Sequence, residues 1–282
     1  MTIITRFAPS PTGNLHLGHA YSALFAFNAA REANGTFLLR IEDIDPSRCH
    51  PAFEQQIYAD LSWLGLTWST PVRRQSDHLD AYQHALASLE SRHLTYPCFC
   101  TRGDIEAEIN AAGGAPHGPD GPIYPGTCRH LGDDERKSRI AAGEPHAIRL
   151  DVAAASEHAG PLSWYDIGLG ERTAAPEQFG DVVLARKDTP TSYHLSVTLD
   201  DHLQGVTLVT RGSDLVEATD IHRLLQALLN LDVPTYHHHR LLYGADGKRF
   251  AKRDHGLTLK SLREEGASPE DIKRMIARLA DA

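Results

Sequence analysis

The chain has 282 residues, 41% of them hydrophobic and 23% charged, and a net charge of −9 from 28 Lys and Arg against 37 Asp and Glu. This composition excludes a mainly disordered chain, a membrane-spanning protein, which needs roughly 20 consecutive apolar residues, and a protein that coats nucleic acid indiscriminately. The four cysteines are too few for a disulfide framework and the N-terminus shows no signal peptide, so we expect a cytoplasmic protein.

The first forty residues predict a strand, a crossover helix and a second strand. Residues 3–7 suit a short strand, and a loop with proline and glycine leads into apolar residues at helical spacing over 17–28. Residues 37–41 predict the second strand, and an acidic cluster follows at 42–45. Ligands bind at the carboxyl ends of the strands in parallel α/β sheets. We therefore expect the loop at 8–19 and the acidic cluster to border a ligand site.

The rest of the chain alternates helical and strand patterns around an unusual middle segment. Residues 53–94 are expected to be helical, whereas residues 96–150 hold three cysteines and a stretch rich in glycine and proline, which predicts an insertion with little regular structure. Strand patterns return at 193–199 and 206–210. A helix capped by Ser213 or Asp214 is expected next. Its buried stripe would consist of Ile221, Leu224, Leu225, Leu228 and Leu229.

Two histidines follow the first strand at a spacing of one helical turn. His16 and His19 lie on one face, and a strand-to-helix turn offers backbone N–H groups and a positive dipole end to a phosphate. Gly18 between them leaves room for a nucleotide near the backbone. From these residues alone, a pair of histidines bonded within the protein or a pair of metal ligands is also consistent.

Residues 248–253 place four cations within six residues, between Gly247 and Gly256. Such a loop can clamp a triphosphate and stabilise charge as it moves, although a solvated basic turn has the same composition. The segment 248–282 carries nine basic against six acidic residues, which leaves a charge of −12 on residues 1–247. An acidic body with a basic end fits a polyanion held at one place; a solvated helical face is the alternative.

The cysteine-rich segment predicts a metal site. Cys98 and Cys100 supply two thiolates and Cys128 a third, and a tetrahedral Zn²⁺ needs a fourth ligand. The candidates by spacing are His117, Tyr124 and His130. A phenolate oxygen is an unusual ligand, so the chemistry alone favours a histidine. Three cysteines that bind no metal are the alternative.

The histidine turn and the basic loop, taken together, resemble the class I aminoacyl-tRNA synthetases. HLGH at 16–19 matches that family's HIGH motif, and RFAKR at 249–253 stands where its KMSKS motif is expected. Further blocks resemble the glutamyl branch of the family, and the resemblance spans residues 3 to about 260. These blocks are RFAPSPTG at 6–13, LRIEDID at 39–45, DDH at 200–202 and RGSD at 211–214.

The resemblance implies an α/β fold, namely a Rossmann-type class I synthetase catalytic domain with a zinc-binding insertion and a short C-terminal helical tail. Its implied segments are 1–95, the first half of the catalytic domain; 96–190, a zinc-stapled, acceptor-binding-like insertion; 191–240, the second half; and 241–282, the KMSKS-like loop and basic helical tail. Tyr124 resembles the tyrosine of a Y-x-x-x-C arm in truncated members of the branch, which implies Tyr124 as the zinc ligand beside Cys98, Cys100 and Cys128.

The resemblance also implies a ligase that uses ATP and Mg²⁺ to activate L-glutamate. The implied ATP-binding residues are His16, Gly18, His19, Arg249 and Lys252, of which His16, His19 and Lys252 would be catalytic. The implied glutamate-binding residues are Arg6, Phe7, Ala8, Pro9, Ser10, Glu42, Tyr193 and Arg211. Arginine suits a bidentate grip on a carboxylate, and Glu42 can accept from an α-ammonium group. An internal ion pair of Arg6 or Arg211 with Glu42 or Asp43 is equally consistent with the residues alone.

The chain departs from the family in two respects. Arg249 and Ala251 replace the first lysine and the serine of the KMSKS motif, so one hydroxyl contact to phosphate is lost. The chain also ends at Ala282, where a glutamyl-tRNA synthetase continues into an anticodon-binding domain. We expect no such domain, as in the truncated branch. The resemblance to that branch implies transfer of glutamate to queuosine at the wobble position of tRNA(Asp), by a monomer with no membrane partner.

Three other functions are compatible with the sequence. A short glutamyl-tRNA synthetase could charge a tRNA 3′ end, and a small-molecule nucleotidyltransferase could use the histidine turn. A non-catalytic paralogue that only binds RNA or a partner is compatible with the altered Arg249 and Ala251. The test is amino-acid-dependent ATP–pyrophosphate exchange, which the last of these would lack.

Overall fold

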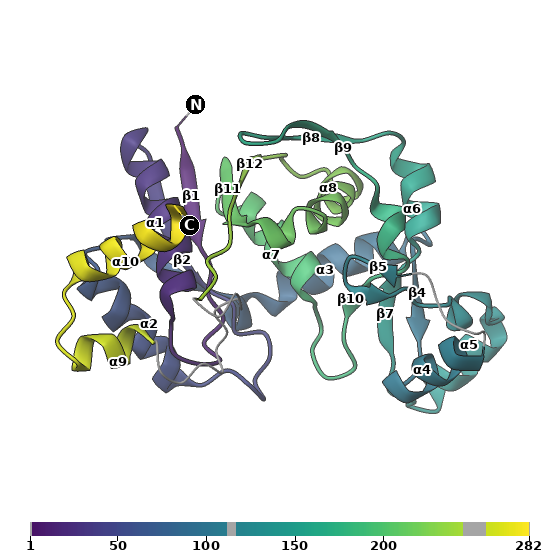
Figure 1. Cartoon of the computed structure of the whole chain (residues 1–282). Helices are drawn as coiled ribbons and strands as arrows, with labels where there is room; N and C mark the ends of the chain where they lie inside the picture. Colours follow the sequence, from purple (N-terminus) through teal and green to yellow (C-terminus); the bar gives the residue numbers. More distant parts are fainter. Residues whose placement is uncertain (1, 112–116, 245–257, 282) are drawn as a thin grey trace.

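The computed structural model describes residues 2–111, 117–244 and 258–281 and shows a mixed α/β molecule (Figure 1). The strands are β1 (Ile4–Phe7), β2 (Thr36–Ile41), β3 (Ser69–Arg74), β4 (Thr95–Cys98), β5 (His117–Gly118), β6 (Gly121–Pro122), β7 (Ala147–Leu150), β8 (Ser163–Asp166), β9 (Gly170–Thr173), β10 (Val183–Ala185), β11 (Leu208–Gly212) and β12 (Thr235–His239). The helices are α1 (Leu17–Glu32), α2 (Pro51–Trp63), α3 (Leu79–Glu90), α4 (Arg102–Ala111), α5 (Asp133–Ala141), α6 (Val152–Ala159), α7 (Tyr193–Leu203), α8 (Ala218–Leu229), α9 (Leu259–Glu264) and α10 (Pro269–Asp281). None of these helices is long and apolar enough to cross a membrane.

The predicted Rossmann-type parallel sheet is confirmed. Strands β1, β2 and β3 are parallel, with Ile4 opposite Thr36, and β11 runs parallel to β12. The two groups meet where the backbone N–H of Thr207 donates to the carbonyl of Ile4 at 3.0 Å. The strands β1 and β11 are therefore neighbours, and each is followed by a helix of the site, α1 after β1 and α8 after β11 (Figure 1). The gap between two such strand ends is where doubly wound sheets bind ligands.

Helix α1 lies close to the sheet because its buried face is made of small side chains. Ala20, Ala23, Ala26 and Ala30 are almost fully buried, and the hydroxyl of Thr5 on β1 donates to the carbonyl of Ala26 at 2.8 Å. The helix stops at residue 33, and Asn34 then takes a left-handed conformation with φ of 51°, as helix ends often do. This tight packing fixes the position of the first turn of α1 relative to β1.

Three secondary-structure predictions were wrong. Residues 193–199 were expected as a strand but form the start of α7, which is buried on almost every side. The segment 53–94 contains β3, which includes Pro71 and starts with exposed residues. Helix α8 is not capped by Ser213 or Asp214, because a 3₁₀ turn at 213–215 precedes it; its predicted apolar stripe is confirmed, with Leu229 only partly buried.

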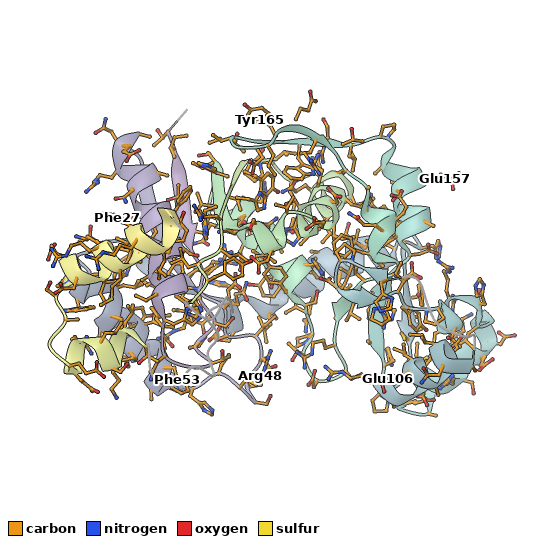
Figure 2. The ribbon with its side chains drawn as sticks, viewed as in Figure 1. Phe27, Arg48, Phe53, Glu106, Glu157 and Tyr165 are labelled. Atoms are coloured by element: carbon orange, nitrogen blue, oxygen red, sulfur yellow. The ribbon has the colours of Figure 1, made fainter. Side chains whose placement is uncertain are left out.

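The middle segment has more regular structure than expected. Strands β4, β7 and β10 form an antiparallel sheet, and α4 and α5 pack near it, at the end of the molecule opposite α9 and α10 (Figure 1). Figure 2 shows the same separation, with Glu106 on α4 far from Phe53 on α2. The C-terminal helices belong to the body, since Ile272 and Ile276 of α10 are buried in the core around α1.

Candidate active site

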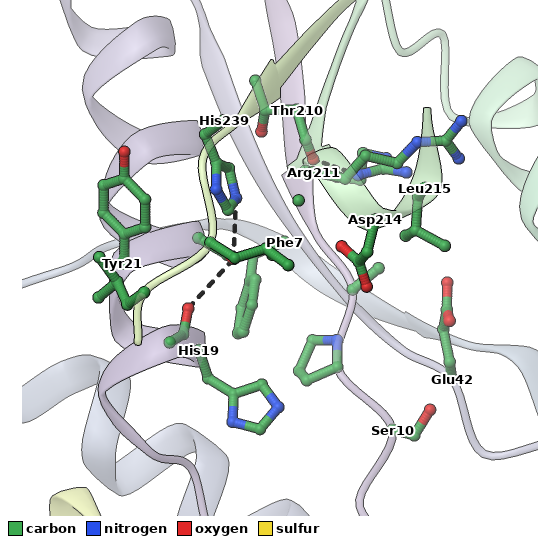
Figure 3. A pocket seen from close by; sticks show the side chains of 18 of the residues that line it. Phe7, Ser10, His19, Tyr21, Glu42, Thr210, Arg211, Asp214, Leu215 and His239 are labelled. Atoms are coloured by element: carbon green, nitrogen blue, oxygen red, sulfur yellow. Dashed lines mark hydrogen bonds between the residues drawn. The ribbon is translucent and has the colours of Figure 1, made fainter. Parts of the chain in front are cut away.

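A cavity of about 310 Å³ opens between α1 and the carboxyl ends of β1 and β11 (Figure 3). In Figure 3, His19 and Tyr21 of α1 lie on one side, and Glu42 and Arg211 lie on the other. All the residues that the sequence predicted for glutamate line this cavity, as do the first three predicted for ATP. They are Arg6, Phe7, Ala8, Pro9, Ser10, Glu42, Tyr193 and Arg211, with His16, Gly18 and His19.

The two predicted histidines form the cap of α1. His16 Nδ1 accepts from the backbone N–H of Gly18 at 3.1 Å, and His19 Nδ1 accepts from the backbone N–H of His16 at 3.2 Å. A neutral imidazole that accepts at Nδ1 carries its proton on Nε2, so both rings have a donor there. The ring centroids are 3.8 Å apart, which confirms that the histidines share one face.

Gly18 leaves room for the ring of His16 at this turn. A Cβ on Gly18 would lie 3.0 Å from Cε1 of that ring, closer than side chains normally approach. The glycine therefore allows the histidine cap to form, in addition to the backbone access expected from the sequence.

The basic loop lies outside the described residues, and with it Arg249 and Lys252. Of the described segments on either side, the first lines the cavity and the second contacts the residues just before α1. Leu241 and Leu242 line it, while Thr258 bridges to His16 and the backbone N–H of Leu259 donates to the carbonyl of Leu15 at 2.8 Å.

Arg6 is ion-paired, but with a carboxylate that the sequence analysis did not consider. Its Nε and Nη2 donate to Asp201 at 3.0 and 3.2 Å, and Arg40, which is fully buried, also donates to Asp201 at 2.7 Å. Burial raises the pKa of an isolated carboxyl, but the charges of Arg6 and Arg40 hold the pKa of Asp201 below its usual value. Arg6 is thus a fixed part of the wall.

Glu42 belongs to the same network through Arg40, whose Nη2 donates to it at 3.2 Å. Burial raises the pKa of Glu42, and the charges of Arg40 and Arg6 oppose that shift. The internal pairs considered from the sequence, Arg6 or Arg211 with Glu42 or Asp43, do not form; Asp43 instead accepts from Ser76. Arg40 and Asp201 were missed as site residues, although both lie in blocks that resemble the glutamyl branch.

Arg211 is held by neutral partners. It is 6% exposed; its Nε donates to His238 Nε2 at 3.1 Å, its Nη1 to His222 Nδ1 at 3.0 Å, and its Nη2 to Thr219 Oγ1 at 2.6 Å. Among the described residues, no carboxylate lies within ion-pair distance of Arg211. A buried cation without an anionic partner is unfavourable, so this position favours an anionic ligand.

Three consecutive histidines, at 237–239, form part of a strand beside the site. These residues belong to β12, and the side chains of His238 and His239 are buried next to the site. His239 lines the cavity and bonds to Ser22 Oγ at 2.9 Å, while His238 Nδ1 bonds to Asp166 Oδ2 at 2.7 Å.

We predict that the protein loses stability as pH falls from 7 to 5. Burial, with Arg211 nearby, lowers the pKa of His238 to about 4, whereas in the unfolded chain it is about 6.5. The unfolded state therefore binds a proton first, and stability present above pH 6.5 is lost as pH falls towards 4. His238 alone should cost about 2 kcal/mol of unfolding free energy at pH 5.

Urea unfolding at pH 7 and pH 5 measures this loss. The His238→Gln variant is the control, because it lacks this titrating group, and its stability should fall by about 2 kcal/mol less. Equal losses in the two proteins would contradict the assignment of the effect to His238.

The predicted metal ligands lie together at the end of β4. The sulfur atoms of Cys98, Cys100 and Cys128 are all within 4.8 Å of one another, and the three residues form no disulfide. The Tyr124 hydroxyl lies 3.4 Å from Cys98 Sγ and 3.6 Å from Cys100 Sγ. The histidines that were the alternative fourth ligands, His117 and His130, are both exposed. Three thiols supply three of the four donors of a closed tetrahedral zinc site, and the Tyr124 hydroxyl lies where the fourth, an unusual oxygen donor, would be needed.

Comparison with known proteins defines the family. The model of the family described as "tRNA synthetases class I (E and Q), catalytic domain" matches residues 2–280, and the chain belongs to this family. The Glutamyl-Q tRNA(Asp) synthetase of Rhodobacter capsulatus is 53% identical over 97% of this chain and 99% of that protein. A protein of the same name from Symbiobacterium thermophilum is 42% identical over 98% of this chain and 85% of its own length.

Solved structures show the same fold. The crystal structure of the glutamate-tRNA synthetase from Elizabethkingia anophelis matches with a TM-score of 0.81 at 28% identity, over 98% of this chain. This chain spans 61% of that longer protein. The shared part is the class I catalytic fold with its parallel sheet.

Proposed function

We propose that this protein activates L-glutamate with ATP and transfers the glutamyl group to queuosine at the wobble position of tRNA(Asp). The observation that carries the proposal is the 53% identity to a Glutamyl-Q tRNA(Asp) synthetase along almost the whole length of both chains. The cavity supports the amino-acid part, because it presents a buried arginine without an anionic partner beside the carboxylate of Glu42.

The chemistry follows from positioning and charge. One oxygen of the glutamate α-carboxylate attacks the α-phosphorus of ATP in line, the bond to the bridging oxygen breaks, and pyrophosphate leaves. Arg211 would hold the side-chain carboxylate and Glu42 the α-ammonium group, so that the attacking oxygen faces the histidine turn. The Nε2–H groups of His16 and His19 would donate to phosphate oxygens. Mg²⁺ bound to the triphosphate would offset its charge.

The second step passes the acyl group to RNA. A hydroxyl of the queuosine cyclopentenediol attacks the carbonyl carbon of glutamyl-adenylate, AMP leaves, and the hydroxyl proton is released. An unpaired wobble base can be extruded from its loop, and such bases are the elements of RNA that proteins recognise best. We place this reaction in the cytoplasm, with a monomeric protein whose insertion at 96–190 contacts the tRNA.

The acceptor can be tested directly with ATP and labelled glutamate. We expect label on tRNA(Asp) that contains queuosine, and none on tRNA(Asp) without queuosine or on tRNA(Glu). Relatives named Glutamate--tRNA ligase are 36 to 39% identical to this chain. They are longer proteins, and the matched region is only 55 to 58% of their length. Label on tRNA(Glu) would therefore replace the proposal with a short enzyme that charges a 3′ end.

We also propose that Cys98, Cys100, Cys128 and Tyr124 hold one structural Zn²⁺. Purified protein should contain about one Zn²⁺ per chain, and Cys98→Ser should release it and lower the thermal midpoint, since structural zinc sites contribute to folding. Cys49→Ser is the matched control: Cys49 is outside the cluster, so metal content should not change. Metal analysis that finds no zinc in the wild type would remove the site.

A further inference from the structure

Two buried arginines, Arg6 and Arg211, line the cavity and a third, Arg40, is buried behind it; the three differ in how their charges are balanced. Arg6 donates to Asp201, and Arg40 donates to both Asp201 and Glu42, so both cations have carboxylate partners. Among the residues that the structure describes, Arg211 donates only to imidazole nitrogens and a hydroxyl. The difference matters because a carboxylate partner offsets the positive charge of a guanidinium and so weakens its attraction for an anionic ligand.

The geometry points to His238 and Asp166 as positioning residues that set the specificity of the site for an anionic amino-acid side chain. This inference rests on the proposed activation of glutamate. Asp166 orients the ring of His238, and His238 in turn orients Arg211, while the ring keeps the negative charge of Asp166 away from the guanidinium. The arginine is thereby fixed in direction but left with its positive charge for the substrate carboxylate.

Asp166 accepts four hydrogen bonds, two of them from His238. Its Oδ2 accepts from Nδ1 of His238 at 2.7 Å and from the backbone N–H of the same residue at 3.0 Å. Its Oδ1 accepts from the backbone N–H groups of Gly168 and Leu169 at 2.8 and 2.9 Å. With the ring proton on Nδ1, Nε2 is an acceptor and receives the Nε–H of Arg211. Both side chains are almost completely buried, so water cannot substitute for these bonds.

The other side of Arg211 is held in the same manner. His222 Nδ1 accepts from Arg211, which leaves the proton of His222 on Nε2, where it faces Nδ1 of His194 at 3.2 Å. Burial and the charge of Arg211 lower the pKa of His222 well below its usual value, so this ring is also neutral. Two neutral rings therefore fix the guanidinium, and neither cancels its charge.

A direct carboxylate in place of His238 would bind Arg211 more strongly but would neutralise it. The histidine is the element that avoids this, and the arrangement therefore selects glutamate over the isosteric but neutral glutamine. Discrimination of this kind depends on a charge left without a partner when the wrong substrate binds.

The first test is the Asp166→Asn variant, studied by calorimetric titration of the full chain with L-glutamate and with ATP. An amide nitrogen facing His238 would donate to Nδ1 and so move the ring proton to Nε2. Two donors, Nε2–H of His238 and Nε–H of Arg211, would then face each other. We expect glutamate affinity to fall by about 10- to 100-fold and the preference over glutamine to shrink, while ATP affinity stays unchanged. General damage to the fold would lower both affinities.

A matched control is Asp220→Asn. Asp220 is a buried carboxylate that accepts from Trp164 and Gln178 and has no contact with Arg211. This variant should alter stability but leave glutamate affinity near that of the wild type. Equal loss of glutamate affinity in both variants would overturn the inference.

A second pair of variants keeps the inference testable if Asp166→Asn does not fold. His238→Gln and His238→Met have similar volumes, but only glutamine offers Arg211 an acceptor. We expect the glutamine variant to bind glutamate within about 5-fold of the wild type and the methionine variant about 10- to 100-fold more weakly. Equal affinities in the two variants would overturn the positioning role.

The outcomes also separate this inference from the proposed function. A wild-type protein that binds glutamate but labels no RNA would overturn the proposed acceptor and leave the role of His238 and Asp166 intact. A wild-type protein that does not bind glutamate would overturn both.

Discussion

Replacing Arg211 with methionine is expected to lower kcat/KM for glutamate-dependent ATP–pyrophosphate exchange by about 10³-fold. The physical reason is that the substrate carboxylate would enter a buried site and find no cation there. Removing one partner of a buried charged pair costs about 2 to 5 kcal/mol, most of it from the charge left behind. The loss should appear mainly in KM for glutamate, because the reacting α-carboxylate is at the other end of the substrate.

The fold should tolerate this change better than the same change at Arg6. Methionine at 211 removes a cation that has no carboxylate partner in the described part of the chain. Arg6→Met instead takes a partner from the buried Asp201 and should cost about 3 kcal/mol of unfolding free energy. Urea unfolding of the two variants, together with the exchange assay, separates substrate binding from stability. An Arg211→Met enzyme with unchanged KM for glutamate would show that the amino acid binds elsewhere.

Much of the site could be predicted from the sequence because its signals are local. The prolines and glycine after the first strand, the spacing of His16 and His19 and the acidic cluster after the second strand all mark the ends of neighbouring strands. The carboxyl ends of parallel strands lie at the same edge of a sheet, so residues that follow these strands come close together. Glu42 and Arg211, from β2 and β11, therefore border one cavity, although they are far apart in the chain.

The supporting residues could not be found in this way, because their partners are distant and polar. Asp166 reaches His238 over 72 residues, and Arg6 reaches Asp201 over 195. Strands are predicted from alternating apolar and polar residues. Three consecutive histidines show no such alternation, so this strand could not be predicted. The one available signal was Tyr236 just before the run, an aromatic residue of a type that strands favour.

Helix α7 was taken for a strand for a related reason. Leucine and valine alternate at 195, 197 and 199, which is a strand pattern, but residues 195–201 are all buried. A helix buried on every side has no polar face to reveal its period of 3.6 residues. Strand β3 was missed for the opposite reason, since an edge strand that contains Pro71 and begins with exposed residues lacks an apolar pattern.

Lys252→Ala is expected to lower kcat for exchange by about 10²- to 10³-fold, the loss typical when a group that stabilises transition-state charge is removed. Lys252 lies outside the described residues, but the ends of its segment are fixed at the cavity. Leu242 lines the cavity on one side, and Thr258, only six residues after Lys252, bridges to His16 on the other. The described residues on both sides of this segment are therefore at or next to the cavity.

The altered motif gives a reason to expect a large effect at this lysine. Ala251 has no hydroxyl, so in the proposed ATP site the charge that builds up as pyrophosphate leaves would be stabilised by Arg249 and Lys252. Lys260→Ala is the matched control, because Lys260 is a half-exposed residue of α9 that pairs with Glu264, and its loss should leave kcat unchanged. Rapid-quench measurement of adenylate formation isolates the chemical step. If that rate is the same in Lys252→Ala and the wild type, the triphosphate is not held by this loop, and the ATP site must be sought in another part of the cavity.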